Sequence, residues 1–274
     1  MITLREGLEA ALIVGIILGY LTAVGAKALA RPIYVGIAAA IVASVAVGAA
    51  FLMLSVEFEG EAEEIFEGAT MFLAAAILTS MILWMHKNSK SYSDSIKRRV
   101  EMAVTRNQTL GLATLAFVSI FREGIETVLF LGSSSFSSSG VSILIGGLLG
   151  IGAAVLVGVA VIRYSLRIDL RRFFQITGIV LVLFAAGLVS RGIGALNEVG
   201  IIPPLAENLW NSGGLISDDG TLGGVLSSLF GYTSSPTLAQ VIGYVSYWSL
   251  VLAWFYRASI LAFLRKTAAL PTTE

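Results

Sequence analysis

Long uncharged apolar stretches alternate with short polar or charged segments along the whole chain. Residues 33–56, 132–162 and 237–256, for example, contain no Asp, Glu, Lys or Arg. About 20 predominantly apolar residues form a helix long enough to cross a bilayer core of about 30 Å. The pattern therefore predicts an all-α integral membrane protein with seven transmembrane helices, at residues 4–25, 33–55, 65–85, 109–131, 141–162, 173–195 and 238–257.

The segments that connect these helices alternate in charge. Lys and Arg follow the first, third, fifth and seventh predicted helices, Glu and Asp follow the second and sixth, and an uncharged Ser-rich turn follows the fourth. Because Lys and Arg concentrate in cytoplasmic loops, every second loop is expected in the cytoplasm. We therefore expect a multi-pass protein of the cell membrane, with its N-terminus outside and its C-terminus in the cytoplasm.

An internal repeat divides the chain. Arg5-Glu6-Gly7-Leu8-Glu9 recurs as Arg122-Glu123-Gly124-Ile125-Glu126, and Gly68 and Ala75-Ala76 are echoed by Gly178 and Ala185-Ala186. A repeat of three helices enters the membrane from the opposite side in its second copy, which is the inverted-repeat plan of many secondary transporters. We expect one transmembrane domain, residues 1–274, made of a first three-helix repeat (1–85), a cytoplasmic loop (86–108), a second three-helix repeat (109–195), an external loop (196–236), and a seventh helix with a cytoplasmic tail (237–274).

The amino-acid composition excludes several classes of function and of metal ligand. Only 13% of the residues are charged, against roughly 25% in soluble domains, and the 18 basic and 18 acidic residues balance, so nothing favours nucleic acid as a partner. Cysteine is absent and histidine occurs once, which leaves oxygen as the abundant metal ligand. No Gly-x-Ser-x-Gly or His-Glu-x-x-His motif is present. We expect a protein that is not an enzyme, that binds no organic cofactor, and whose partner is the lipid bilayer.

The repeated motif carries the candidate chemistry. Its glutamates are three residues apart and its arginine lies four before the second glutamate, so all three project from one helix face. One charge in mid-membrane costs roughly 2.5 to 3.5 kcal/mol, so six isolated charges would cost on the order of 15 to 20 kcal/mol. Ionised, the two motifs sum to minus two, which suits a divalent cation and hard oxygen ligands. The predicted metal ligands are Glu6, Glu9, Glu123 and Glu126, with Arg5 and Arg122 holding the carboxylates apart and limiting the negative charge. The alternative is that each motif is a buried ion pair that holds helices together.

Other residues have two interpretations each. Glu61 and Glu64, in the acidic segment before the third predicted helix, either collect cations outside the membrane or complement the dipole of a helix N-terminus. Glu67 enters the apolar helix, and we favour a metal-binding role for it. Arg191 either balances Glu67 or extends outward to the interface. Met71, Met81 and Met85 are interpreted as packing residues, and Trp84 as an interfacial one.

The chain resembles the oxidase-dependent iron permeases, which comprise the fungal high-affinity iron permease and its bacterial relatives. The resemblance covers nearly the whole chain and rests on a set of short motifs: Arg5-Glu6-Gly7-Leu8-Glu9-Ala10-Ala11, Phe66-Glu67-Gly68, Trp84-Met85, Arg122-Glu123-Gly124-Ile125-Glu126, Ala185-Ala186-Gly187-Leu188, Leu229-Phe230-Gly231-Tyr232 and Ser235-Pro236. It departs at the start, where only four residues precede Arg5. Either the start lies further upstream, or the first motif is expected near the outer membrane surface.

The resemblance implies uptake of iron, with the motif glutamates as translocation ligands and an external ferroxidase or iron-binding protein delivering the ion. Iron is then the substrate. The net charge of the site fits Fe(II), whereas Fe(III) is the harder ion and fits a ferroxidase partner, so the oxidation state stays open. Alternatives are a permease for another cation such as lead or manganese, an intramembrane hydrolase, and a scaffold subunit of a membrane complex.

Overall fold

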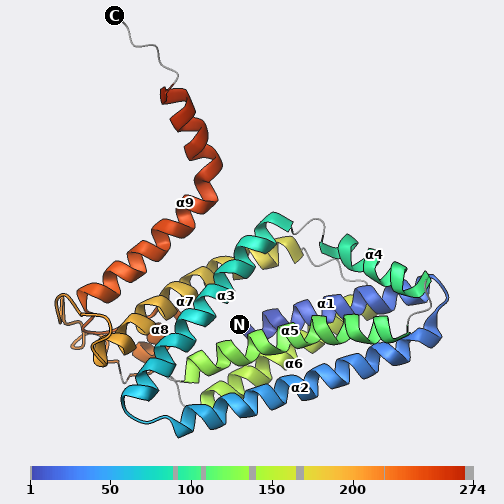
Figure 1. Ribbon diagram of the computed structural model, residues 1–274, viewed down its shortest axis with the longest axis horizontal. Coiled ribbons are helices and arrows are strands. Elements are labelled where there is room, and N and C mark those ends of the chain that lie inside the picture. Colours follow the sequence, from blue (N-terminus) through green and yellow to red (C-terminus); the bar gives the residue numbers. More distant parts are fainter. Residues whose placement is uncertain are drawn as a thin grey trace, which may run out of the picture.

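The computed structural model describes residues 2–88, 92–105, 109–135, 140–164, 170–218 and 220–268. Within these ranges the chain is helical and contains no strand (Figure 1). The elements are α1 (Ile2–Ala23), η1 (Lys27–Leu29), α2 (Ala30–Glu57), α3 (Glu61–Asn88), α4 (Tyr92–Thr105), α5 (Thr109–Ser135), α6 (Gly140–Tyr164), α7 (Leu170–Glu198), α8 (Thr221–Phe230) and α9 (Leu238–Ala268). The prediction of an all-α protein is confirmed.

Six of the described helices are long and apolar enough to cross a membrane. These candidate spans are Ile2–Ala23, Ala30–Ser55, Glu61–Met85, Ile143–Ala160, Ile176–Glu198 and Leu238–Arg257. The remaining predicted span, 109–131, coincides with α5, a helix of 27 residues. It carries Arg122, Glu123 and Glu126 near its middle, so every 18-residue stretch of α5 contains all three charges, whereas the charges of the first motif lie at the start of α1. A multi-pass membrane protein is therefore supported.

Two short helices, α4 and α8, lie where the sequence analysis expected only loops. α4 occupies part of the expected cytoplasmic loop because Ile96, Val100 and Ala103 form one apolar face, which is buried beside α1 and α5. α8 lies in the expected external loop and ends at Gly231, whose φ of 68° is left-handed and favours glycine. The backbones of Gly231 and Gly187 of α7 approach so closely that neither position has room for a Cβ.

The helices of the bundle pack in pairs through small residues. α2 lies along α5, with Gly36 against Ala113 and Gly48 against Val128, so the two helices run in the same direction. α1 lies along α6 in the same way, with Thr3 against Gly150 and, further along, Ala11 against Gly158. α3 pairs with α7, and α1 also contacts α5, which runs in the opposite direction (Figure 1). Small residues allow the close backbone approach on which helix association in lipid depends.

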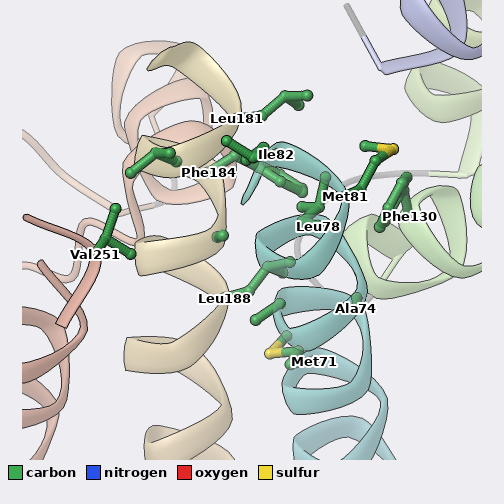
Figure 2. Packing of buried hydrophobic residues seen from close by; sticks show 13 residues of the cluster. Met71, Ala74, Leu78, Met81, Ile82, Phe130, Leu181, Phe184, Leu188 and Val251 are labelled. Atoms are coloured by element: carbon green, nitrogen blue, oxygen red, sulfur yellow. The ribbon is translucent and has the colours of Figure 1, made fainter. Parts of the chain in front are cut away.

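Two apolar clusters hold these pairs together. The first joins α3 and α7, with Phe130 of α5 and Val251 of α9 at its edges (Figure 2). The second joins α1, α4 and α5 around Ile13 and Ile17. The outward faces of α2 and α6 are also apolar, with large exposed residues such as Val42 and Leu156. Apolar residues on both sides of a helix are typical of a protein whose solvent is lipid.

The close approach of α2 to α5 predicts that Gly36→Ala destabilises the protein. A Cβ at this position would meet the backbone carbonyl of Ala113, which cannot rotate away. Overpacking of this kind costs about 1–3 kcal/mol. Unfolding by SDS titration of the detergent-solubilised protein measures the loss. Gly146→Ala is the matched control, because a Cβ there meets nothing within 4 Å, and an equal loss in both variants would contradict the packing argument.

Candidate metal site

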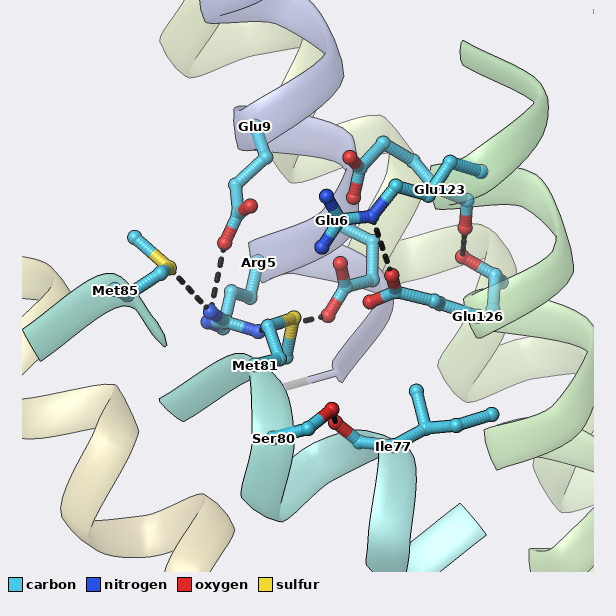
Figure 3. Close-up of polar contacts among 11 residues, drawn as sticks. Arg5, Glu6, Glu9, Ile77, Ser80, Met81, Met85, Glu123 and Glu126 are labelled. Carbon is cyan, nitrogen blue, oxygen red and sulfur yellow. Dashed lines mark hydrogen bonds and ion pairs between the residues drawn. The ribbon is translucent and has the colours of Figure 1, made fainter. Parts of the chain in front are cut away.

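The two repeated motifs meet in the interior of the bundle. Arg5, Glu6 and Glu9 lie on one face of α1 and are 2%, 1% and 6% exposed. Glu123 and Glu126, near the middle of α5, are 4% and 6% exposed and point toward the same space (Figure 3). The first motif therefore lies beside the centre of α5, although it is close to the start of the chain.

Each arginine pairs with glutamates of its own motif, but the two pairings differ. Arg5 bridges both of its glutamates, with Nη1 3.0 Å from Glu6 Oε1 and Nη2 2.8 Å from Glu9 Oε1. Arg122 pairs through Nε with Glu126 Oε1 at 2.8 Å, and its side chain is 48% exposed. Arg5 is thus a buried counter-ion, whereas Arg122 reaches a more open space.

Three carboxylates from two helices converge. Glu6, Glu9 and Glu123 each offer one oxygen, and these oxygens all lie within 4.8 Å of one another. Two oxygens bound to one ion at 2.3–2.6 Å, the range of Ca²⁺ ligands, are separated by at most about 5 Å. The spacing is therefore compatible with a shared metal ion without a large movement of either helix.

Several carboxylate oxygens at this site lack a partner. Glu6 Oε2, Glu123 Oε2 and Glu126 Oε2 are buried and have no hydrogen-bond partner among the residues that the structure describes. A buried acceptor without a partner is costly, and ion pairs that only held helices together would leave few of them. With four carboxylates and two guanidinium groups the ionised site carries minus two, so a bound cation would satisfy both the charge and the free oxygens.

One turn of α3 completes the surroundings of the arginines. Arg5 Nη1 donates to Met81 Sδ at 3.0 Å, and Nη2 donates to Met85 Sδ at 2.8 Å. The guanidinium carbon of Arg122 lies 5.8 Å from the centroid of the Trp84 ring. Sequence reasoning missed these contacts because methionine and tryptophan in an apolar helix ordinarily indicate packing or an interface. Their spacing, which puts all three on one face, was the available signal.

The other candidate residues lie elsewhere. Glu67 is fourteen residues before Met81 on α3, which corresponds to about 21 Å along the helix. It is partly buried and faces the charge of Arg191, because Gly68 and Gly192 bring α3 and α7 together. Glu64 is partly buried and Glu61 is exposed. The structure therefore groups Glu67 with Arg191 and keeps both apart from the carboxylates of the two motifs.

Comparison with known proteins finds one family model and relatives that match nearly the whole chain. The sequence profile of the Iron permease FTR1 family matches residues 1–268. An uncharacterised protein of Archaeoglobus fulgidus is 35% identical over 266 residues, which cover 94% of each chain. The Ferrous iron permease EfeU of Yersinia pestis is 33% identical over 258 residues (93% of this chain and 92% of its own), and that of Escherichia coli O6:H1 is 31% identical over 243 residues (88% of each). No solved structure matches the chain.

The unequal burial of the two arginines predicts unequal effects of Arg5→Met and Arg122→Met on stability. Arg5→Met leaves buried carboxylates without their counter-ion, which costs about 3–5 kcal/mol in comparable sites. Arg122→Met removes the counter-ion of one buried carboxylate instead of two, and the half-exposed Arg122 lies where water can replace part of its interaction with Glu126, so we expect a smaller loss. The free energy of unfolding in detergent, measured by SDS titration, tests this. Equal losses would contradict the difference in environment.

Proposed function

The chain belongs to the iron permease FTR1 family, and we propose that it moves iron across the cell membrane through the carboxylates of α1 and α5. Membership supports a transporter rather than an enzyme, with iron as the transported ion. The observation that carries the specific proposal is the convergence of Glu6, Glu9 and Glu123 from two helices, with buried oxygens that have no partner within the described residues. Glu126, paired with Arg122, is the fourth ligand of the proposed site.

We propose that α5 is the seventh span and that the two halves form inverted repeats. The packing of the helices supports this. Gly7 of α1 lies against Ala154 of α6, and its counterpart Gly124 of α5 lies against Ser44 of α2. One turn further on, Ala11 against Gly158 corresponds to Val128 against Gly48. In both pairs of contacts α1 corresponds to α5, and α6 corresponds to α2. Two repeats of opposite orientation require this correspondence.

Fe(II) is the ion that we propose. The ionised site has a charge of minus two, which one divalent ion neutralises. Relatives from Yersinia pestis and Escherichia coli are named ferrous iron permeases. Oxygen ligands by themselves discriminate weakly among divalent ions, so manganese and lead are the competing substrates to measure. A scaffold subunit is the less favoured candidate, because a structural role does not call for unpartnered buried oxygens on both helices.

The acidic start of α3 is proposed as the place where cations first collect. Glu61 and Glu64 lie in the first turns of α3, with Glu67 about one turn further in, and their negative field would raise the local cation concentration. Arg191 would balance Glu67. An external iron-binding protein or ferroxidase would deliver the ion on this side, which in our proposed topology also holds residues 196–236.

We expect Glu123→Gln to lower Fe(II) uptake below about one-tenth of the wild-type rate, a loss of about 1.4 kcal/mol or more. The change removes a charge and a metal ligand but conserves shape. Anaerobic uptake of Fe(II) into proteoliposomes, with Mn(II) and Pb(II) as competitors, measures the effect. Glu207→Gln is the control, because Glu207 is exposed outside the spans. Normal uptake by Glu123→Gln at wild-type abundance would contradict the assignment of Glu123 as a metal ligand.

The topology can be tested cleanly because the chain contains no cysteine. Leu215 is 89% exposed in the segment proposed to be external, and Met102 is 56% exposed on α4, proposed to be cytoplasmic. A membrane-impermeant maleimide should label Leu215→Cys in intact cells and should label Met102→Cys only after lysis. The reverse pattern would overturn the orientation.

A further inference from the structure

One turn of α3 contacts the arginines of both motifs. Met81 and Met85 accept hydrogen bonds from Arg5, and Trp84 lies under Arg122. Figure 3 shows the Arg5 guanidinium between the carboxylates of α1 and the two thioethers of α3. Nη1 is 3.0 Å from Glu6 Oε1, as a hydrogen bond and ion pair, and 3.0 Å from Met81 Sδ. Nη2 is 2.8 Å from Glu9 Oε1, as an ion pair, and 2.8 Å from Met85 Sδ.

The acceptors on the two sides of the Arg5 guanidinium differ in the strength with which they bind it. Carboxylates are charged acceptors and form the stronger hydrogen bonds, whereas a thioether sulfur is a weak, neutral and polarizable acceptor. A metal ion competes with the guanidinium for the carboxylates, because both are cations. A divalent oxygen-seeking ion competes far less for the thioethers. Entry of the ion would therefore break the ion pairs of Arg5 with Glu6 and Glu9 and spare its hydrogen bonds to the two sulfurs.

We propose that Met81 and Met85 are positioning residues that retain Arg5 when an iron ion takes its place at Glu6 and Glu9. This inference rests on the proposed function. Arg5 is 2% exposed, so water cannot readily satisfy its N–H groups once the carboxylates are occupied. Donors left without acceptors in such a place are costly. The thioethers keep Arg5 hydrogen-bonded in the ion-bound state and so favour binding of the ion.

Arg122 has no such requirement. Its side chain is 48% exposed, and on α3 it lies against the face of the Trp84 indole ring. It can exchange Glu126 for water when an ion binds. The thioether pair therefore belongs to the first motif, and its removal should act on ion binding at Glu6 and Glu9 and leave the second motif unchanged.

The experiment compares Met81→Leu/Met85→Leu with the wild type in anaerobic Fe(II) uptake by proteoliposomes. Leucine conserves the apolar volume and removes both acceptors. Without the ion, Arg5 of the variant still pairs with Glu6 and Glu9. With the ion bound, it has neither these carboxylates nor the sulfurs as acceptors. Binding of the ion should therefore weaken, and we expect KM to rise about tenfold, equivalent to about 1.4 kcal/mol. The maximal rate should fall less. A defect of packing alone would lower the maximal rate per protein and leave KM unchanged, and that result would overturn the proposal.

Two further variants sharpen the result. Met71→Leu is the control, because Met71 is a fully buried methionine of the same helix that lies in the α3–α7 core; its KM should match the wild type. Met81→Gln/Met85→Gln restores an oxygen acceptor on a side chain of similar length and should bring KM back toward the wild-type value. If glutamine fails to restore KM and preference shifts toward Mn(II), the sulfurs act as ligands of the ion and the positioning role is wrong. Absence of iron uptake by the wild type would instead reject the proposed function itself.

Discussion

The structure depends on one constraint: four carboxylates lie in an interior that has little water, and each negative charge needs a nearby positive one. Arg5 meets this need for Glu6 and Glu9 with two short ion pairs, and Arg122 meets it for Glu126. Such pairs stabilise only when the remaining lone pairs are also satisfied, and here Glu6, Glu123 and Glu126 each keep a buried oxygen without a partner in the described chain. The site is neutralised in part and left able to accept a cation.

Small residues make this arrangement possible. α1 and α5 meet at the site, and each is held from behind by another helix that approaches at glycine: α6 behind α1 and α2 behind α5. Within lipid there is little hydrophobic drive between helices, so close packing supplies the association. Gly7 and Gly124, inside the motifs, serve this packing directly, since a Cβ on either would collide with Ala154 or Ser44. The repeated spacing of charges and the close helix contact thus come from the same short sequence.

Much of this could be read from the sequence, and the limits have physical reasons. The long apolar segments predict the helices, and the motif spacing places the charges of each copy on one face. The start of α3 at Glu61 rather than near residue 65 was missed because acidic residues suggest a loop, although they also suit the positive end of a helix dipole. α4 was missed because its apolar face is only Ile96, Val100 and Ala103, diluted by basic residues. The contacts of Met81 and Met85 were missed: their spacing shows that they share a helix face, but only tertiary packing decides that this face meets Arg5.

A built-in guanidinium also bears on how an ion can leave. Sites that conduct must bind strongly enough to admit the ion and weakly enough to release it, and carboxylates alone, in a medium of low dielectric constant, would hold a divalent ion tightly. The Arg5 guanidinium forms ion pairs with the same carboxylates, so it would compete with the ion from inside the protein. In the proposed site, the net affinity for iron would then be a difference between two cations, the ion and the guanidinium, that compete for Glu6 and Glu9. In such an exchange Glu6 and Glu9 would always have a counter-ion, so neither the empty nor the ion-bound state would bear the full cost of isolated charges in the membrane.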